Sequence, residues 1–263
     1  MEFILQMFNR ILFLVRKGIL INEELKEKIK KIVGEREIFF IKFENFKKED
    51  LEDIDLIITL GGDGTFIKAA NMIEDTFILG INYYHRVSEG ALTSLNFLEI
   101  EKLKEVFKGN FEVLIRQRAK VKLNGKALDL YATNEVYVGA ESQFHSSRYK
   151  IGFNENKEEH RSSGIIISTG TGSPAWFYSA GGEIFDPSEE KLSFIVREPY
   201  FGKRVFKPTL LKGDIKKNEK IVIESTRDFG GILAINDITY EFNKGAIAEI
   251  ELADKPLKVI IAI

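Results

Sequence analysis

The sequence of 263 residues contains no cysteine. Disulfides, thiolate zinc sites, iron–sulfur clusters and cysteine nucleophiles are therefore excluded. Only three histidines occur, His85, His145 and His160, and their wide spacing argues against a histidine-rich metal site. A chain without cysteine suits a reducing compartment.

Long apolar runs and an excess of positive charge are also missing. The longest apolar stretches, Ile11–Val15 and Ile54–Leu60, are far shorter than the roughly 20 residues that span a bilayer. Met1–Arg10 has an early acidic residue and no small-residue cleavage site, so we expect no signal peptide. The formal net charge of −2 offers no basic surface to a nucleic-acid backbone. We therefore expect a cytoplasmic protein that binds neither nucleic acid nor membranes.

The residues that are present have the composition of a globular protein, with 44% hydrophobic and 30% charged residues. Along the first hundred residues, strand and helix patterns alternate, which is typical of a parallel sheet with helices on its faces. The strands expected there are Ile11–Val15, Glu37–Phe43, Asp55–Leu60 and Phe77–Ile81, and the helices are Glu23–Val33 (capped by Asn22), Thr65–Ile73 and Glu101–Phe107.

In the second half, strands follow one another closely, and Asn124-Gly125 is a hairpin signal. We predict an α/β plus all-β fold. A Rossmann-like parallel α/β domain spans residues 1–98, and an antiparallel β-sandwich domain spans residues 99–263, with a last strand that could return to the first domain. The later strands expected are Asn134–Val138, Gly164–Ser168, Leu192–Val196, Lys220–Glu224, Ile232–Ile235, Ile247–Leu252 and Lys258–Ile261, with one helix at Ser173–Ala180.

A glycine loop follows the third expected strand, with the sequence Leu60-Gly61-Gly62-Asp63-Gly64-Thr65. Glycines let the backbone approach phosphates, and the start of the next helix adds partial positive charge. Gly61, Gly62, Gly64 and Thr65 are therefore candidate phosphate-binding residues. Asp63 could accept the proton of an attacking hydroxyl as a general base. The alternative is a tight turn with a helix-capping Asp.

Basic residues for the phosphates are harder to choose. Lys68, Arg148 and Arg161 lie near motifs in the sequence, although each could equally be a solvated surface charge. Neither a Walker A loop nor a dinucleotide fingerprint is present.

The Gly-Gly-Asp-Gly-Thr string resembles a signature shared by NAD kinases and by the diacylglycerol and sphingosine lipid kinases. Thr133–Val136 resembles the Asn-Glu motif of NAD kinases, and Gly164–Trp176 resembles their glycine-rich motif. The three motifs occur in the order of that family. A lipid kinase and a non-catalytic nucleotide sensor are the alternatives.

The resemblance implies phosphoryl transfer from ATP to the adenosine-ribose 2′-hydroxyl of NAD, with Mg²⁺ bridging the phosphates of ATP and no metal bound by the protein alone. It also implies that NAD binds between the two domains and that the chain forms a homodimer or homotetramer. The resemblance does not decide whether the acceptor is NAD or NADH. It also leaves open whether the donor is ATP, another triphosphate or polyphosphate. The NAD-binding residues implied are Asn134, Glu135, Arg161, Ser163, Thr171, Ala175, Trp176 and Asp237.

Some motifs resemble one branch of the family, the mitochondrial-type NAD kinases of animals and their bacterial relatives. They are Ser88-Glu89-Gly90, Arg161–Gly164 and Arg197-Glu198-Pro199.

Two positions depart from the usual pattern. Ser163 stands where most NAD kinases have an Asp implicated in nicotinamide recognition, and Trp176 replaces a Tyr. Trp176 could contact a nucleotide or could belong to the core.

Overall fold

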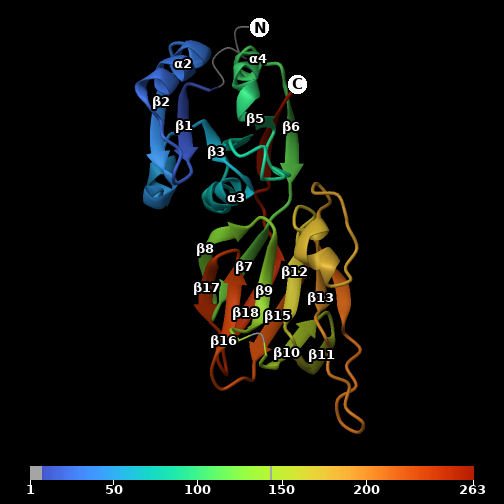
Figure 1. Cartoon of the computed structure of the whole chain (residues 1–263). Helices are drawn as coiled ribbons and strands as arrows, with labels where there is room; N and C mark the ends of the chain where they lie inside the picture. Colours follow the sequence, from blue (N-terminus) through green and yellow to red (C-terminus); the bar gives the residue numbers. More distant parts are fainter. Residues whose placement is uncertain (1–7, 143) are drawn as a thin grey trace. The chain divides into compact units, whose positions relative to one another are not determined.

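The computed structural model describes residues 8–142 and 144–263 (Figure 1). The chain divides into two compact units, Met1–Ile115 with Leu257–Ile263, and Arg116–Pro256. The expected boundary after residue 98 lies too early, because the strand Phe111–Arg116 extends the sheet of the first unit. The segment Met1–Arg10, for which we expect no signal peptide, lies largely outside the described part, because residues 1–7 are not described.

A sheet of parallel strand pairs forms the centre of the first unit. Its order is β2-β1-β3-β4-β19-β6, with β5 also paired to β4. The pairs β1–β2, β1–β3, β3–β4, β4–β19 and β4–β5 are parallel, so these strands have their carboxyl ends at one edge. The strands are β1 (Arg10–Val15), β2 (Glu37–Lys42), β3 (Leu56–Gly61), β4 (Phe77–Asn82), β5 (Leu95–Asn96), β6 (Phe111–Arg116) and β19 (Leu257–Ala262).

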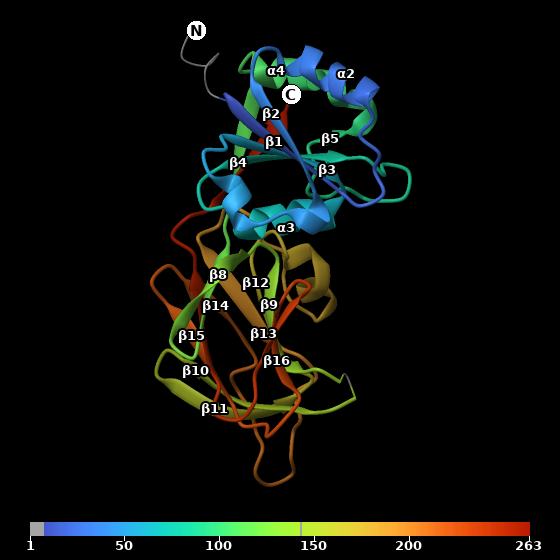
Figure 2. The ribbon, with the colours of Figure 1, turned by 90° about the vertical axis from the view of Figure 1, so that its left-hand side faces the viewer.

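Helices cover both faces of this sheet (Figure 2). On one face, α2 (Glu23–Val33) and α4 (Leu103–Phe107) contribute Ile29 and Leu103 to a buried core, and on the other face α3 (Asp63–Met72) contributes Phe66. The Asn22 side chain caps α2, since its Oδ1 accepts from Leu25 N at 3.0 Å. The 3₁₀ turns are η1 (Phe43–Asn45), η2 (Lys48–Leu51) and η3 (Phe97–Lys102).

Two antiparallel sheets form the second unit, in the orders β11-β10-β15-β18-β7-β8 and β14-β13-β12-β9-β16-β17. Side chains from both sheets share one buried core, which makes this unit a sandwich. The strands are β7 (Ala119–Leu123), β8 (Lys126–Ala132), β9 (Glu135–Ala140), β10 (Ser147–Phe153), β11 (Asn156–Ser162), β12 (Ile165–Ser168), β13 (Lys191–Val196), β14 (Lys212–Lys216), β15 (Lys220–Ser225), β16 (Gly231–Ile235), β17 (Ile238–Glu241) and β18 (Ile247–Leu252). The predicted fold class is confirmed.

Helix boundaries differ from the prediction at three places. The helix α3 begins at Asp63 rather than Thr65, and the helix expected at Glu101–Phe107 starts as the 3₁₀ turn η3. The helix expected at Ser173–Ala180 is irregular: it begins as η4 (Ser173–Phe177), and it is kinked at Ala175, whose backbone angles of φ −93° and ψ −121° are not helical.

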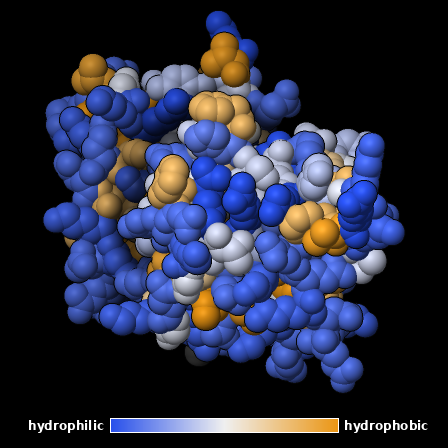
Figure 3. All heavy atoms as spheres, turned by 90° about the horizontal axis from the view of Figure 1, so that it is seen from below, coloured by the Kyte–Doolittle hydropathy of each residue, from blue (hydrophilic) through white to orange (hydrophobic). Residues whose placement is uncertain are grey.

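Alternation along β9 sets the position of the candidate nucleotide-binding side chains. Val136 and Val138 point into the sandwich core, so Glu135 and Tyr137 belong to the opposite face of the sheet. Tyr137 there packs near Ile166 and Phe177. The face of the molecule drawn in Figure 3 is mostly hydrophilic, with separate small apolar groups. No helix in the described residues is long and apolar enough to cross a membrane.

Candidate functional site

The glycine loop joins the carboxyl end of β3 to the first turn of α3. Gly61 has no room for a side chain, because a Cβ there would lie 2.3 Å from Thr65 Oγ1. Thr65 is 3% exposed, so its hydroxyl supports the loop from beneath. Gly64 is exposed, and a Cβ there would meet no atom within 4 Å. The amides of the first turn of a helix have no partner within the helix, and they can therefore bind an anion.

The Asp63 carboxylate is held by two backbone amides of a neighbouring loop. Oδ1 accepts from Leu92 N at 2.9 Å, and Oδ2 accepts from Ala91 N at 3.2 Å. A carboxylate has about four acceptor positions, so two amides leave capacity for a proton from a substrate hydroxyl. Asp63 does not cap α3, because Gly62 is the N-cap residue and the hydrogen bonds of the Asp63 carboxylate go to residues outside the helix.

Asn82, at the end of β4, organises the loop that holds Asp63. Its Oδ1 accepts from Tyr84 N at 3.0 Å, and its Nδ2 donates to Ser88 O at 3.0 Å. Gly90, with φ +65°, packs so closely that a Cβ would lie 2.4 Å from Asn82 Nδ2. Sequence reasoning missed this role, because the side chain acts on residues that no motif connects to it.

The cations chosen from the sequence have other partners in the structure. Lys68 Nζ donates to Phe43 O at 2.9 Å and lies 4.0 Å from the Phe43 ring centroid. Arg161 packs over the Phe206 ring at 4.2 Å. Arg148 lies on β10 opposite Arg161, in the second unit. A further cation, Arg16, belongs to no sequence motif, yet it lies beside Gly62.

In the second unit, Asn134 and Glu135 stand at the start of β9 with buried polar atoms. Asn134 Oδ1 and Glu135 Oε2 are buried and have no hydrogen-bond partner among the described residues. Burial raises the pKa of the Glu135 carboxyl to about 7. Buried polar atoms without partners are rare in folded proteins and require an explanation, which a bound ligand would supply.

The glycine-rich loop Gly170–Gly172 packs against the protein's own backbone. A Cβ at Gly170 would lie 2.2 Å from Asp186 O, and one at Gly172 would lie 2.3 Å from Asn134 O. Thr169 N donates to Asn134 O at 2.9 Å. These contacts join the loop to the start of β9, so the expected residues Asn134, Glu135 and Thr171 lie in one region.

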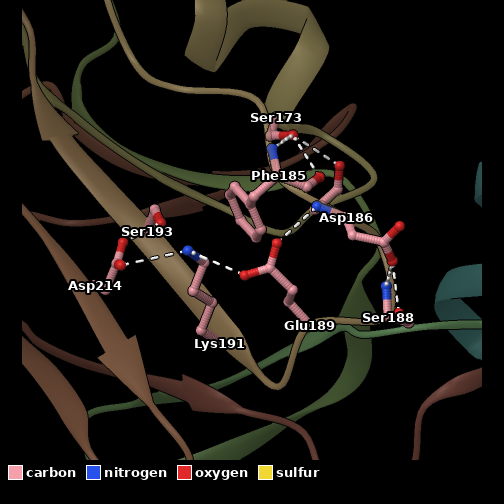
Figure 4. A network of polar contacts seen from close by, with 9 residues as sticks. Ser173, Phe185, Asp186, Ser188, Glu189, Lys191, Ser193 and Asp214 are labelled. Atoms are coloured by element: carbon pink, nitrogen blue, oxygen red, sulfur yellow. Dashed lines mark hydrogen bonds and ion pairs between the residues drawn. The ribbon is translucent and has the colours of Figure 1, made fainter.

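A network of polar contacts supports the end of this loop (Figure 4). Ser173 Oγ donates to Gly170 O at 2.8 Å and accepts from Phe185 N at 3.1 Å. Lys191 Nζ then bridges Glu189 and Asp214 at 3.2 and 3.4 Å. Thr171 Oγ1 accepts from Arg116 Nη1 at 3.3 Å. The start of η4 is therefore fixed by side chains from several strands and loops.

Trp176 and Ser163 line a hollow of about 360 Å³ on the outer face of the sheet. The Trp176 ring lies 5.0 Å from the Tyr137 ring, and the Arg197 guanidinium lies 4.9 Å from it. Tyr137 Oη donates to Ser163 O at 2.9 Å. Trp176 is 38% exposed and lies outside the core, with part of its ring open to a ligand.

The remaining expected residues lie at the surface or elsewhere in the second unit. Ala175 is exposed at the bend in η4. Asp237 is exposed in the turn between β16 and β17, next to Asn236, whose buried Nδ2 has no partner in the described part of the chain. Within residues 8–142 and 144–263, no group of three or more His, Asp or Glu side chains could hold a metal ion.

The chain has a parallel α/β unit, whose glycine loop presents a carboxylate, and a second, all-β unit. This arrangement is suited to phosphoryl transfer onto a hydroxyl group. The class of protein is thus a small-molecule kinase. Residues 9–111 match the model of the ATP-NAD kinase N-terminal domain. An NAD kinase from Clostridium botulinum is 30% identical over 90% of this chain and 84% of its own length. The chain belongs to the NAD kinase family.

Two further similarities agree with this assignment. A probable NADH kinase from rice, Oryza sativa, is 28% identical over 92% of this chain and 82% of its own length. The crystal structure of an NAD kinase from Archaeoglobus fulgidus in complex with ATP matches the fold with a TM-score of 0.70. It covers 95% of this chain and 92% of that one at 24% identity.

Proposed function

We propose that this chain transfers the γ-phosphoryl group of ATP to the adenosine-ribose 2′-hydroxyl of NAD, which yields NADP and ADP. The observation that carries the proposal is the Asp63 carboxylate in a glycine loop at the carboxyl end of β3, in a member of the NAD kinase family. Ligands of open α/β sheets bind at this edge.

Asp63 acts as the general base. As the 2′-oxygen attacks the γ-phosphorus, the new O–P bond forms, the bond to ADP breaks, and the hydroxyl proton passes to the carboxylate. The amides of Ala91 and Leu92 keep that carboxylate in position. A general base of this kind contributes a factor of about 10² to 10⁴ in rate.

The phosphates of ATP bind over Gly61, Gly62 and Gly64, with the Thr65 hydroxyl packed beneath Gly61. Mg²⁺ enters as part of the MgATP substrate, bridging phosphate oxygens and neutralising charge. Lys68 has weaker support, because its ammonium group already contacts the carbonyl and ring of Phe43.

NAD is held by the second unit. Asn134 pairs with the adenine edge, and the Glu135 carboxylate accepts from ribose hydroxyls, which would supply the partners that these buried atoms lack. We extend this assignment to Thr171 and Ala175, and to Trp176 and Ser163, which line the hollow beside Tyr137. Arg161 and Asp237 have weaker support, because Arg161 packs on Phe206 and Asp237 lies exposed in a turn.

We place the chain in the mitochondrial-type branch and expect a cytoplasmic homo-oligomer. The support for the branch is that Ser163, Arg197 and Glu198, all from its motifs, line one hollow with Trp176. Ser163 occupies the position of the usual Asp. A planar ring of a ligand bound in this hollow would contact the Trp176 and Tyr137 rings and the Arg197 guanidinium.

The test is Asp63→Asn, with NADP formation from MgATP and NAD measured in a coupled assay. Turnover should fall by about 100-fold or more. Asp53→Asn is the matched control, because Asp53 is an exposed aspartate of the same unit and its φ of +58° suits asparagine. Near-normal turnover of Asp63→Asn, or an equal loss in the control, would contradict the proposed base.

A further inference from the structure

A triphosphate carries several negative charges, and the glycine loop alone supplies only backbone amides to offset them. Phosphoryl transfer depends on positioning and on stabilisation of that charge. Lys68, the cation nearest to the loop in sequence, is committed to the Phe43 carbonyl and ring. A further cation beside the loop would add to the charge that offsets the phosphates.

Arg16 directly follows β1, and β1 pairs with β3 so that Val15 lies beside Leu60. Arg16 N donates to Leu60 O at 2.9 Å, which fixes its backbone next to the glycine loop. A Cβ placed on Gly62 would lie 4.0 Å from Arg16 Nη1 and 3.0 Å from Ser88 Oγ. The guanidinium and the hydroxyl thus lie close to the loop backbone at Gly62, which is itself buried.

The Arg16 guanidinium is oriented but not neutralised. It lies 5.0 Å from the centroid of the Tyr84 ring, and it makes no ion pair with any described residue. Tyr84 and Ser88 are held by the Asn82 side chain, which bonds to the backbone of both. By contrast, Arg10 at the other end of β1 pairs with Glu37 at 3.4 Å.

We propose that Arg16 and Ser88 form, above Gly62, a cradle that binds the phosphate chain of the nucleoside triphosphate. This assignment rests on the proposed function and adds to it the residue that neutralises the donor. A guanidinium suits the task because its planar N–H groups bind two phosphate oxygens at once. The Tyr84 ring keeps the guanidinium in place. Glycine at position 62 lets the guanidinium and the Ser88 hydroxyl come close to the loop backbone.

The experiment compares Arg16→Gln, Arg16→Lys and the control Lys17→Gln, which removes an equally exposed charge from the next residue. Arg16→Gln should raise the KM for MgATP by about tenfold or more and leave the KM for NAD within about twofold. Arg16→Lys should restore part of the loss, and Lys17→Gln should behave as the unaltered protein. Inorganic tripolyphosphate, tested as an inhibitor against MgATP, should bind Arg16→Gln more weakly by a similar factor.

Gly62→Ala tests the same space without changing charge. Its φ of −133° is accessible to alanine, so the added methyl acts mainly by filling the cradle. We expect weaker inhibition by tripolyphosphate in this variant also.

Unchanged KM for MgATP and unchanged tripolyphosphate inhibition in Arg16→Gln would overturn the assignment, even if turnover fell. A selective rise in the KM for NAD would overturn it as well. These outcomes leave the proposed function intact as long as the unaltered protein forms NADP. If the unaltered protein formed no NADP, the proposed function would fail. Calorimetric titration of Arg16→Gln with tripolyphosphate would still show whether Arg16 binds phosphate.

Discussion

The glycine loop Gly61–Gly64 and the glycine-rich loop Gly170–Gly172 differ in what surrounds their glycines. Gly64 faces open space, and Gly62 faces the cradle formed by movable side-chain ends. Gly170 and Gly172 instead touch backbone carbonyl groups of the same unit, at 2.2 and 2.3 Å from a would-be Cβ. The first loop thus combines a packed Gly61 with an open Gly64, whereas both glycines of the second loop pack against backbone.

The two candidate site carboxylates, Asp63 and Glu135, also differ. Asp63 accepts two amide hydrogen bonds from its own unit, so the protein already satisfies it. Glu135 has a buried oxygen without a partner in the described chain, and burial raises its pKa to about 7. The comparison teaches that the carboxylate of the first unit is already held by the protein, whereas the region around Glu135 contains unsatisfied polar groups that a ligand can complete.

The largest effect on stability is expected for Gly172→Ala. The new methyl would meet three backbone atoms of Asn134, which cannot move aside as a flexible side chain can. The free energy of unfolding should fall by about 3 kcal/mol or more, which lowers Tm by about 6–12 °C. Thermal unfolding followed by circular dichroism measures this loss. A variant with unchanged Tm would mean that the second loop is as open as the first.

The sequence was sufficient for the layers of the fold and for the glycine loop, because both depend on local patterns. The apolar run at β3 and the glycines after it predict a strand, a turn and a helix without any distant residue. By contrast, β11 (Asn156–Ser162) was missed because its residues are mostly polar, with only His160 and Ser162 buried. The strand exists because β10 pairs with it along seven residues.

The roles of individual site residues were predicted less well, for a similar reason. Lys68 seemed suited to phosphates from its position in the chain, but its ammonium group lies against Phe43, from a segment distant in sequence. Arg16 and Asn82 belong to no motif and become relevant only when parallel pairing brings the ends of β1, β3 and β4 to one edge. Residue type predicts chemistry, but tertiary contacts decide which residues are available for it.

A second prediction uses Glu135→Gln to sharpen the comparison of the two carboxylates. The Glu135 carboxyl has a pKa of about 7 in the fold and an ordinary value of 4.5 when unfolded. Between these values the folded state retains a proton that the unfolded state has lost. The carboxyl therefore destabilises the fold progressively as pH rises from about 4.5 to 7, by about 2–3 kcal/mol in all.

Glu135→Gln removes this titration. The free energy of unfolding of the variant minus that of the unaltered protein should therefore increase from pH 5 to pH 8. Tm measured without nucleotide at several pH values gives the difference, and affinity for NAD measured by calorimetry should fall in the same variant. Parallel Tm curves for the two proteins across this pH range would show that the carboxyl is not desolvated.

A third prediction concerns the support of the second loop. Ser173→Ala removes the hydroxyl that bonds to Gly170 O and Phe185 N, and Ser173 is fully buried. Because Phe185 N then lacks its acceptor, unfolding should become easier by about 1–2 kcal/mol. Ser179→Ala is the control, since Ser179 is exposed and bonds only to Ala175 O within its own turn. Equal Tm values for both variants would contradict the proposal that the Ser173 hydroxyl stabilises the second loop.

The smallest effect on stability is expected for Gly64→Ala, and it has the opposite sign. Gly64 lies in the first turn of α3, and a methyl there meets no atom within 4 Å. Alanine favours the helix, so the fold should gain about 0.5–1 kcal/mol. The KM for MgATP should nevertheless rise, because the methyl occupies space that phosphate needs to reach the amides of the helix start. Tm and KM measured together test both effects. A variant that gains stability and keeps its KM would show that the phosphates do not approach Gly64, and it would confine the donor site to the space above Gly62.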